Sequence, residues 1–226
     1  MTYYGTRKRC YKCYRPMSSC MCEHISPIET ETKFVILMHP KEFKKVKNNT
    51  GFLTHLSLSN SEVIMGIDFS DNQRINHIIE THDSYVLFPS PNVVNISHEN
   101  PKAQTQTNKP LAIFLIDSTW ACTRKMFTLS SNLNTLKHMS FTTSRVSQYG
   151  IKEQPQEHFL STIESTLVVL EELHKHNIEQ ISQSQFDGFL NPFFKMIEYQ
   201  KHIMANSISN YKRDIDKREK KSIECL

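Results

Sequence analysis

The sequence predicts an α/β fold in which a largely parallel sheet carries helices on both faces, with a small metal-binding segment ahead of it. Two observations predict this architecture. Between residues 31 and 180, short apolar runs alternate with amphipathic stretches, which is the pattern of a parallel sheet with helical crossovers. Four of the six cysteines lie between Cys10 and Cys22. We therefore expect a zinc-binding segment at residues 1–30, the main domain at residues 31–180, and a helical extension with a charged tail at residues 181–226.

Five apolar runs have the length and composition of buried strands. Proline follows the apolar part of the first and third runs, and proline cannot donate a hydrogen bond within a sheet. A polar linker at residues 95–110 precedes the fourth run. The expected strands are residues 33–40, residues 62–67, residues 84–91, the run that opens at Leu111, and residues 137–142.

Stretches with helical spacing of apolar residues lie around these runs. The second of them begins with an acidic residue, Asp71, which is a typical N-cap. The last one is the most clearly amphipathic. The expected helices are residues 49–59, residues 71–82, the stretch after Trp120, and residues 156–174.

The composition is that of a chain that buries a core without crossing a membrane. Of its 226 residues, 38% are hydrophobic and 22% are charged. No apolar run approaches bilayer length, and residues 1–5 lack the apolar segment of a secretory signal, so we expect a cytoplasmic protein with no membrane partner. No dimer-forming helix is recognisable, and we expect a monomer. Only five glycines occur, and the absence of GxGxxG and P-loop patterns disfavours kinases, P-loop NTPases and ordinary dinucleotide enzymes. The net charge of +4 permits an anionic partner.

The cysteine cluster has the pattern C-x2-C-x6-C-x-C, formed by Cys10, Cys13, Cys20 and Cys22. In a reducing compartment such a cluster holds a metal more often than disulfides. A set of four thiolates has no open coordination position and is typical of a structural zinc site. A redox-active C-x2-C pair would leave Cys20 and Cys22 unexplained, and four unrelated cysteines would not cluster in this way.

Polar residues follow three of the apolar runs, at residues 39–42, 88–90 and 117–120. Ligands of parallel sheets gather beyond the carboxyl ends of the strands, so these residues are expected to share one pocket. Taken singly, each has a simpler explanation, because Asp117 or Ser118 could cap the next helix and Trp120 could pack in the core.

The chain resembles the DTW-domain family, the tRNA-uridine aminocarboxypropyltransferases. The D-x-T-W signature fits residues 117–120, and five further elements of the family follow the order of the chain over roughly Cys10 to Leu173. These elements are the cysteine signature at Cys10, Cys13, Arg15, Pro16, Cys20 and Cys22; His39, Pro40 and Glu42 with Asn49 and Thr50; Phe88, Pro89 and Ser90; Ser147, Tyr149, Gln154 and Pro155; and Ser161, Thr162 and Glu164. One departure is Lys152, where the family often carries arginine.

The resemblance implies a SPOUT-like fold with a deep knot and a transferase that uses S-adenosylmethionine. The implied reaction moves the 3-amino-3-carboxypropyl group to N3 of a tRNA uridine, usually uridine 47 of the variable loop, giving acp3U and methylthioadenosine. In this reading Asp117 takes or orients the N3 proton, and Trp120 lies against the sulfonium in a cation–π contact.

The remaining site residues follow from the strand ends and from the family match together. The expected cofactor-binding residues are Phe88, Pro89, Ser90, Asp117, Thr119, Trp120, Ser147, Tyr149, Gln154, Ser161, Thr162 and Glu164. The expected RNA-binding residues are His39, Glu42, Lys47, Asn49, Thr50 and Lys152. Two other functions stay open: a SPOUT-type RNA methyltransferase that uses the same cofactor, and a non-catalytic zinc-bearing RNA-binding module.

Overall fold

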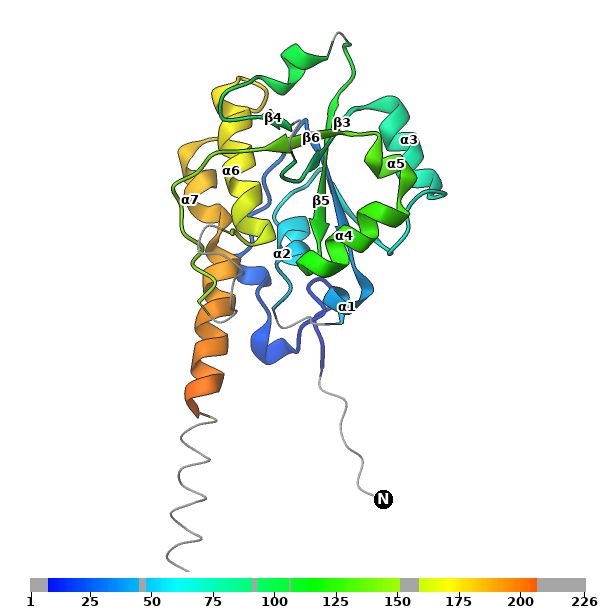
Figure 1. The fold of residues 1–226 in the computed structure, drawn as a ribbon. Coiled ribbons are helices and arrows are strands. Elements are labelled where there is room, and N and C mark those ends of the chain that lie inside the picture. The colour runs from blue at the N-terminus through cyan, green and yellow to red at the C-terminus, as the bar shows by residue number, and fades with distance from the viewer. Residues whose placement is uncertain (1–7, 45–47, 91–92, 106, 151–158, 207–226) are drawn as a thin grey trace, which may run out of the picture.

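The computed structural model describes residues 8–44, 48–90, 93–105, 107–150 and 159–206. Within them the chain forms a six-stranded sheet with the order β2-β1-β5-β3-β6-β4, and each neighbouring pair of strands is parallel (Figure 1). The strands are β1 (Lys33–Met38), β2 (Ser61–Met65), β3 (Asp83–Leu87), β4 (Val93–Asn95), β5 (Leu111–Asp117) and β6 (Lys137–Ser140). The five expected strands are confirmed, whereas β4, of three residues, is too short to show an alternating pattern and was not predicted.

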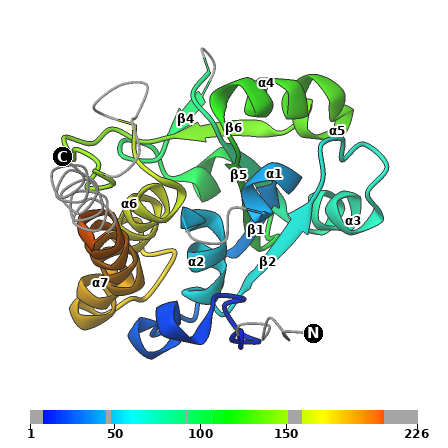
Figure 2. The ribbon, with the colours of Figure 1, turned by 90° about the horizontal axis from the view of Figure 1, so that it is seen from below.

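Helices cover both faces of the sheet, as expected (Figure 2). On one face lie α2 (Thr50–Leu56), α6 (Thr162–Lys175) and α7 (Gln183–Phe189). On the other lie α3 (Gln73–Thr81), α4 (Trp120–Leu129) and α5 (Ser131–Asn134). Strand β1 shows why two cores form. Phe34 and Ile36 pack with α2 and α6, while Val35 and Leu37 pack with α3, α4 and α5, because successive side chains of a strand point to opposite faces.

Two predicted helix starts need correction. Asn72, not Asp71, caps α3, and its side chain accepts a hydrogen bond from the backbone N–H of Ile75 at 3.0 Å. Helix α6 begins at Thr162 instead of residue 156, because Ser161 and Glu164 form a capping box that fixes the first turn there. Residues 156–158 lie outside the described part of the chain.

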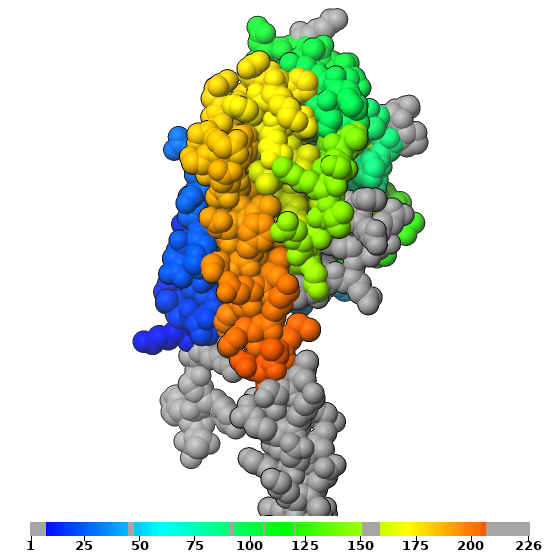
Figure 3. All heavy atoms as spheres, turned by 90° about the vertical axis from the view of Figure 1, so that its left-hand side faces the viewer, coloured from blue at the N-terminus to red at the C-terminus, as the bar shows by residue number. Residues whose placement is uncertain are grey.

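The chain's N-terminal segment lies beside its last described helix, residues 191–206 (Figure 3). Met21 and Ile28 are buried in the same core as Phe193 and Met196, so the cysteine segment packs on the main domain. No helix among the described residues is long and apolar enough to cross a membrane. The knot, the SPOUT assignment and the domain boundaries at residues 30 and 180 stay predictions, and the charged tail lies outside the described residues.

Candidate active site

A pocket of about 640 Å³ opens at the carboxyl ends of β3, β5 and β6, where the strand-end residues were expected to meet. Its volume is typical of sites for small-molecule ligands, about 300–1,000 Å³. The predicted site residues that line it are Glu42, Asn49, Thr50, Phe88, Pro89, Asp117, Thr119, Tyr149, Ser161 and Thr162. Segments that are far apart in the sequence are therefore brought to one cavity.

Asp117 ends β5 and carries the carboxylate of this pocket. Its side chain is buried, with 7% of the residue exposed, and its Oδ1 accepts a hydrogen bond from the Thr162 hydroxyl at 2.8 Å. Asp117 does not cap the helix that follows it, because Thr119 is the N-cap of α4. The simpler explanation of this aspartate as a cap is therefore wrong, and its side chain faces the cavity wall formed by the start of α6.

The backbone of α2 passes close to the same carboxylate at Gly51. A Cβ atom at this position would lie 2.5 Å from Cγ and 2.6 Å from Oδ2 of Asp117, distances that real Cβ contacts do not reach. Gly51 therefore leaves the space in which the Asp117 carboxylate sits. The sequence pattern does not reveal this residue, because the need for glycine here arises only from the packing of β5 against α2.

Gly51→Ala is expected to lower the turnover of this protein at least about tenfold, because the added methyl group displaces Asp117 and small misplacements of reacting groups are costly. The matched control is Gly188→Ala in α7, where the nearest atom to the added Cβ would be Asn191 Nδ2 at 3.8 Å. Both variants are compared with the parent by single-turnover assay and by thermal unfolding. Equal turnover of Gly51→Ala and the parent would show that the Asp117 position tolerates movement.

Tyr149 also lines the pocket, and its ring packs on Phe193 with ring centroids 5.4 Å apart. Its hydroxyl donates a hydrogen bond to the carbonyl oxygen of Asn48. Burial, and after it the charge of Asp117, raise the pKa of Tyr149 well above its ordinary value. The phenol is therefore a protonated donor at neutral pH, and it ties the 147–149 segment to the chain just before α2.

Glu164 holds the same segment against the start of α6. Its Oε2 accepts hydrogen bonds from the backbone N–H and hydroxyl of Ser161, at 2.8 and 2.6 Å, and from the Ser147 hydroxyl at 2.8 Å. Its Oε1 accepts from the backbone N–H of Gln148 at 2.8 Å. These contacts place Thr162 and Tyr149 at the pocket, while Glu164 and Ser147 lie behind the lining that the described residues form.

Two other predicted residues, His39 and Asn49, serve as N-caps. His39 Nδ1 accepts from the backbone N–H of Lys41 at 3.1 Å and so opens α1 (Pro40–Phe43). Asn49 Oδ1 accepts from the backbone N–H of Phe52 at 2.7 Å, and its Nδ2 donates to the carbonyl oxygen of Glu42 at 3.0 Å. The two caps therefore bring Glu42 to the pocket, whereas His39 is buried beside it.

Some predicted site residues cannot be placed in this way. Lys47, Lys152, Gln154 and the side chain of Trp120 lie outside the described part of the structure, although the backbone of Trp120 begins α4. Ser90 follows Pro89 without lining the described pocket. The pocket also contains residues that sequence analysis did not single out, among them Asn48, Ser140, Phe141, Phe159 and Leu160. Phe141 follows directly after β6, so the strand-end rule could have found it.

The four cysteines form a compact sulfur cluster on the N-terminal segment. All four Sγ atoms lie within 4.8 Å of one another, with Cys10 to Cys22 at 3.6 Å and Cys13 to Cys20 at 3.7 Å. A tetrahedral zinc ion with Zn–S bonds of about 2.3 Å needs sulfur–sulfur separations of about 3.8 Å. The donor set and its spacing therefore fit a structural zinc ion.

The pKa values of these thiols also fit a metal site. Backbone N–H groups of Cys13 and Lys12 lower the pKa of Cys10 to about 6, which favours the thiolate form that binds metal. Burial raises the pKa values of Cys20 and Cys22, and a bound dication is the charge that would offset this cost.

Arg15 joins the cysteine segment to the C-terminal helix. It is 3% exposed, and its guanidinium donates to Met196 Sδ at 3.3 Å. Burial lowers the pKa of Arg15, and the nearby Cys13 and Tyr149 oppose this shift. Negative charge close to a buried guanidinium stabilises it, and a zinc ion with four thiolates, which carries two net negative charges, would contribute to this.

The chain matches the sequence model described as "DTW domain" over residues 7–201. It is 25% identical over 236 residues to "tRNA-uridine aminocarboxypropyltransferase 2" of Macaca fascicularis, covering 97% of this chain and 76% of that protein. It is 30% identical over 179 residues to the protein of the same name from Mus musculus, covering 77% of this chain and 59% of that protein. The Drosophila melanogaster protein of that name is 29% identical over 175 residues, covering 73% and 67%. No solved structure gives a significant match.

The matched residues include the cysteine cluster, the strand-end pocket with Asp117, and the segment that Glu164 holds against α6. The match extends over most of the chain. This protein therefore belongs to the DTW domain family.

Proposed function

We propose that this protein transfers the 3-amino-3-carboxypropyl group from S-adenosylmethionine to N3 of a tRNA uridine, with uridine 47 as the target. The observation that carries the proposal is the buried carboxylate of Asp117, which lies in a strand-end pocket of a DTW-family chain. The names of the relatives support tRNA uridine as the substrate and aminocarboxypropyl transfer as the reaction. The cytoplasmic location and the monomeric state stay predictions.

The reaction requires the protein to hold the reacting carbon against N3 and to accept or orient the N3 proton. Bound S-adenosylmethionine supplies a carbon that is activated by its positive sulfonium, and the pocket has to hold this carbon against N3. Such positioning lowers the activation barrier by about 7–11 kcal/mol in favourable cases. In the overall reaction a carbon–sulfur bond breaks with its electron pair going to sulfur, a carbon–N3 bond forms, and the N3 proton leaves. The pocket combines apolar residues such as Leu115 and Phe141 with hydroxyls and carboxylates, a lining that suits a ligand with an adenine ring and an amino acid end.

Asp117 is the group that we assign to the N3 proton, as the acceptor or as the group that orients the imide. Thr162 and the glycine at position 51 fix where its carboxylate lies, and this fixed placement is what proton transfer requires. Trp120 begins α4 two residues after the Asp117-Ser118 pair, and we assign its indole to the sulfonium. Cys10, Cys13, Cys20 and Cys22 hold a zinc ion with no free coordination position, so zinc stabilises the fold and takes no part in the reaction.

Incubation of the protein with S-adenosylmethionine and bulk tRNA is expected to release methylthioadenosine in step with the appearance of acp3U. The measurement is mass spectrometry of the nucleosides together with chromatography of the small-molecule product. Replacement of uridine 47 by cytidine in a tRNA transcript is expected to abolish the product on that transcript.

The other functions give different results in the same assay. Formation of adenosylhomocysteine with a methylated nucleoside would identify a methyltransferase and contradict the proposal. Binding of tRNA without either small-molecule product would identify a non-catalytic RNA-binding module.

A further inference from the structure

Aromatic side chains meet where the cysteine segment contacts α1 and α2. The ring of Tyr14 lies 5.4 Å from that of Phe52 and 6.4 Å from that of Phe43, and Phe43 and Phe52 are 6.5 Å apart, all as ring centroids. Tyr14 remains 48% exposed, and Tyr11, three residues earlier, is 97% exposed. We refer to Tyr14, Phe43 and Phe52 as the aromatic surface.

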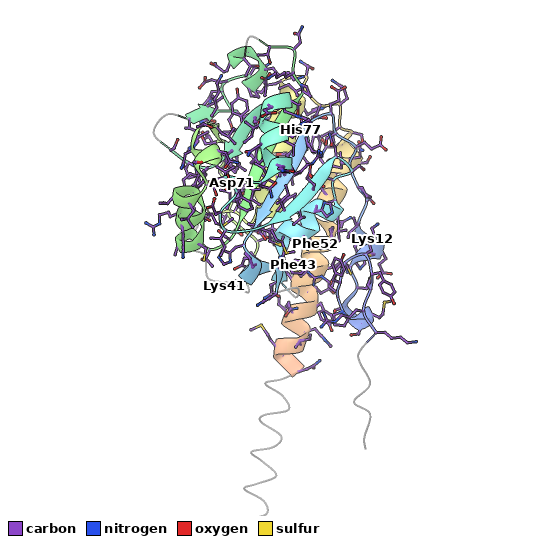
Figure 4. All side chains as sticks on the ribbon, turned by 90° about the vertical axis from the view of Figure 1, so that its right-hand side faces the viewer. Lys12, Lys41, Phe43, Phe52, Asp71 and His77 are labelled. Atoms are coloured by element: carbon purple, nitrogen blue, oxygen red, sulfur yellow. The ribbon has the colours of Figure 1, made fainter. Side chains whose placement is uncertain are left out.

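Lysines flank the aromatic surface on both sides. Figure 4 shows Phe43 and Phe52 between Lys41 on one side and Lys12 on the other, and both lysines are exposed. Three basic residues of the segment 8–15 are exposed, namely Lys8, Arg9 and Lys12, and the segment has no acidic residue. Its exposed face therefore has the charge that favours contact with phosphates.

Tyr14 has a backbone conformation that is unusual for a residue with a large side chain. It has φ 56°, in the left-handed region, where glycine and asparagine are favoured and other residues lose about 1–2 kcal/mol. The turn itself explains the backbone, because the Tyr14 N–H closes it by donating to the carbonyl oxygen of Cys10 at 2.9 Å. The turn itself needs no aromatic ring at this position. The ring packs on Phe52 and Phe43, and about half of it stays open to solvent.

The aromatic surface adjoins the active-site pocket. Asn49 lines the pocket, and it also lines a shallow hollow formed with Tyr14, Phe43 and Phe52. Phe43 directly follows Glu42, another residue of the pocket. The pocket and the hollow are therefore adjacent, and they meet at Asn49.

We propose that the aromatic surface stacks an unpaired base next to the target uridine, while Lys12 and Lys41 contact the adjoining phosphates. The proposal rests on the proposed function, because it takes tRNA as the substrate. N3 is on the Watson–Crick edge of uridine, so the target is unpaired when it reacts, and it lies in a loop whose other bases are also open to stacking. Aromatic side chains beside basic groups are the usual means by which proteins hold unpaired nucleotides.

Tyr14→Leu tests the stacking. Leucine keeps an apolar contact with Phe52 and an unbranched Cβ in the same turn, but it removes the π face. We expect tRNA binding measured at equilibrium, without turnover, to weaken about tenfold. Zinc content, S-adenosylmethionine binding and turnover at saturating tRNA should stay close to the parent, and Tyr14→Phe should restore tRNA binding.

The matched control is Phe194→Leu, the same kind of change at another exposed aromatic residue, on the C-terminal helix. It should leave tRNA binding unchanged. Lys12→Gln should weaken binding and reduce the slope of log affinity against log salt by about one, as expected for one lost phosphate contact. If Tyr14→Leu loses zinc, the binding measurements on Phe52→Leu and Lys12→Gln test the proposal in its place.

Unchanged tRNA affinity in Tyr14→Leu would overturn the proposal. If Tyr14→Leu has lost zinc, unchanged tRNA affinity in Phe52→Leu and Lys12→Gln would overturn it. Equal weakening by Phe194→Leu would also overturn it, because the effect would then not be specific to this surface. The binding measurement needs no product, so a failure of the proposed transferase activity would appear separately, as tRNA binding with neither methylthioadenosine nor acp3U.

Discussion

Asp117→Asn is expected to lower single-turnover rates by on the order of a hundredfold or more, while the fold and the affinity for S-adenosylmethionine stay nearly intact. Asparagine has the same shape as aspartate, and its carbonyl oxygen can accept the hydrogen bond that the Thr162 hydroxyl gives to Asp117 Oδ1 at 2.8 Å. The amide cannot take a proton from N3, so the help of a positioned base is lost, which is usually a factor of about 10²–10⁴. The measurements are cofactor titration and single-turnover kinetics on one tRNA.

Ser118→Ala is the matched control for this variant. Ser118 lines the same pocket, and its hydroxyl shares a hydrogen bond with that of Thr123 at the start of α4. Its removal should have a mild effect on turnover. A parental rate in Asp117→Asn would mean that the carboxylate serves the architecture of the strand end and not the chemistry.

Cys13→Ser is expected to remove most of the bound zinc and to lower the melting temperature by about 10 °C. Cys13 is 1% exposed and its sulfur lies 3.7 Å from that of Cys20. A structural metal binds the folded state, so its free energy of binding is part of the free energy of unfolding. A loss of roughly 3–4 kcal/mol would shift the melting temperature of a chain of this size by about this amount.

Cys122→Ser separates the effect of the cluster from that of cysteine replacement in general. Cys122 is a half-buried free thiol on α4, outside the sulfur cluster. The zinc content of the Cys122→Ser variant, measured by elemental analysis, should match that of the parent protein. Full zinc occupancy in Cys13→Ser would remove Cys13 from the set of ligands.

Features that depend on neighbouring residues were predictable from the sequence, and features that depend on distant contacts were not. The apolar run of β5 and the polar residues after it predicted both a buried strand and a pocket at its end. The need for glycine at position 51 depends on a carboxylate at position 117, which no local pattern shows. The start of α6 depends on which of several polar residues forms the N-cap. Ser161 forms it, because the side chain of Glu164 completes a capping box with it.

The contact between Arg15 and Met196 joins segments 181 residues apart, and this has a consequence for synthesis on the ribosome. The cysteine segment emerges long before the helix at residues 191–206. Proteins are made at about 5–20 residues per second, so roughly ten to forty seconds pass before Met196 can cover the guanidinium. During that interval the four cysteines can come together, but the arginine beside them remains in water. The cysteine segment is thus made well before the helix that completes its burial.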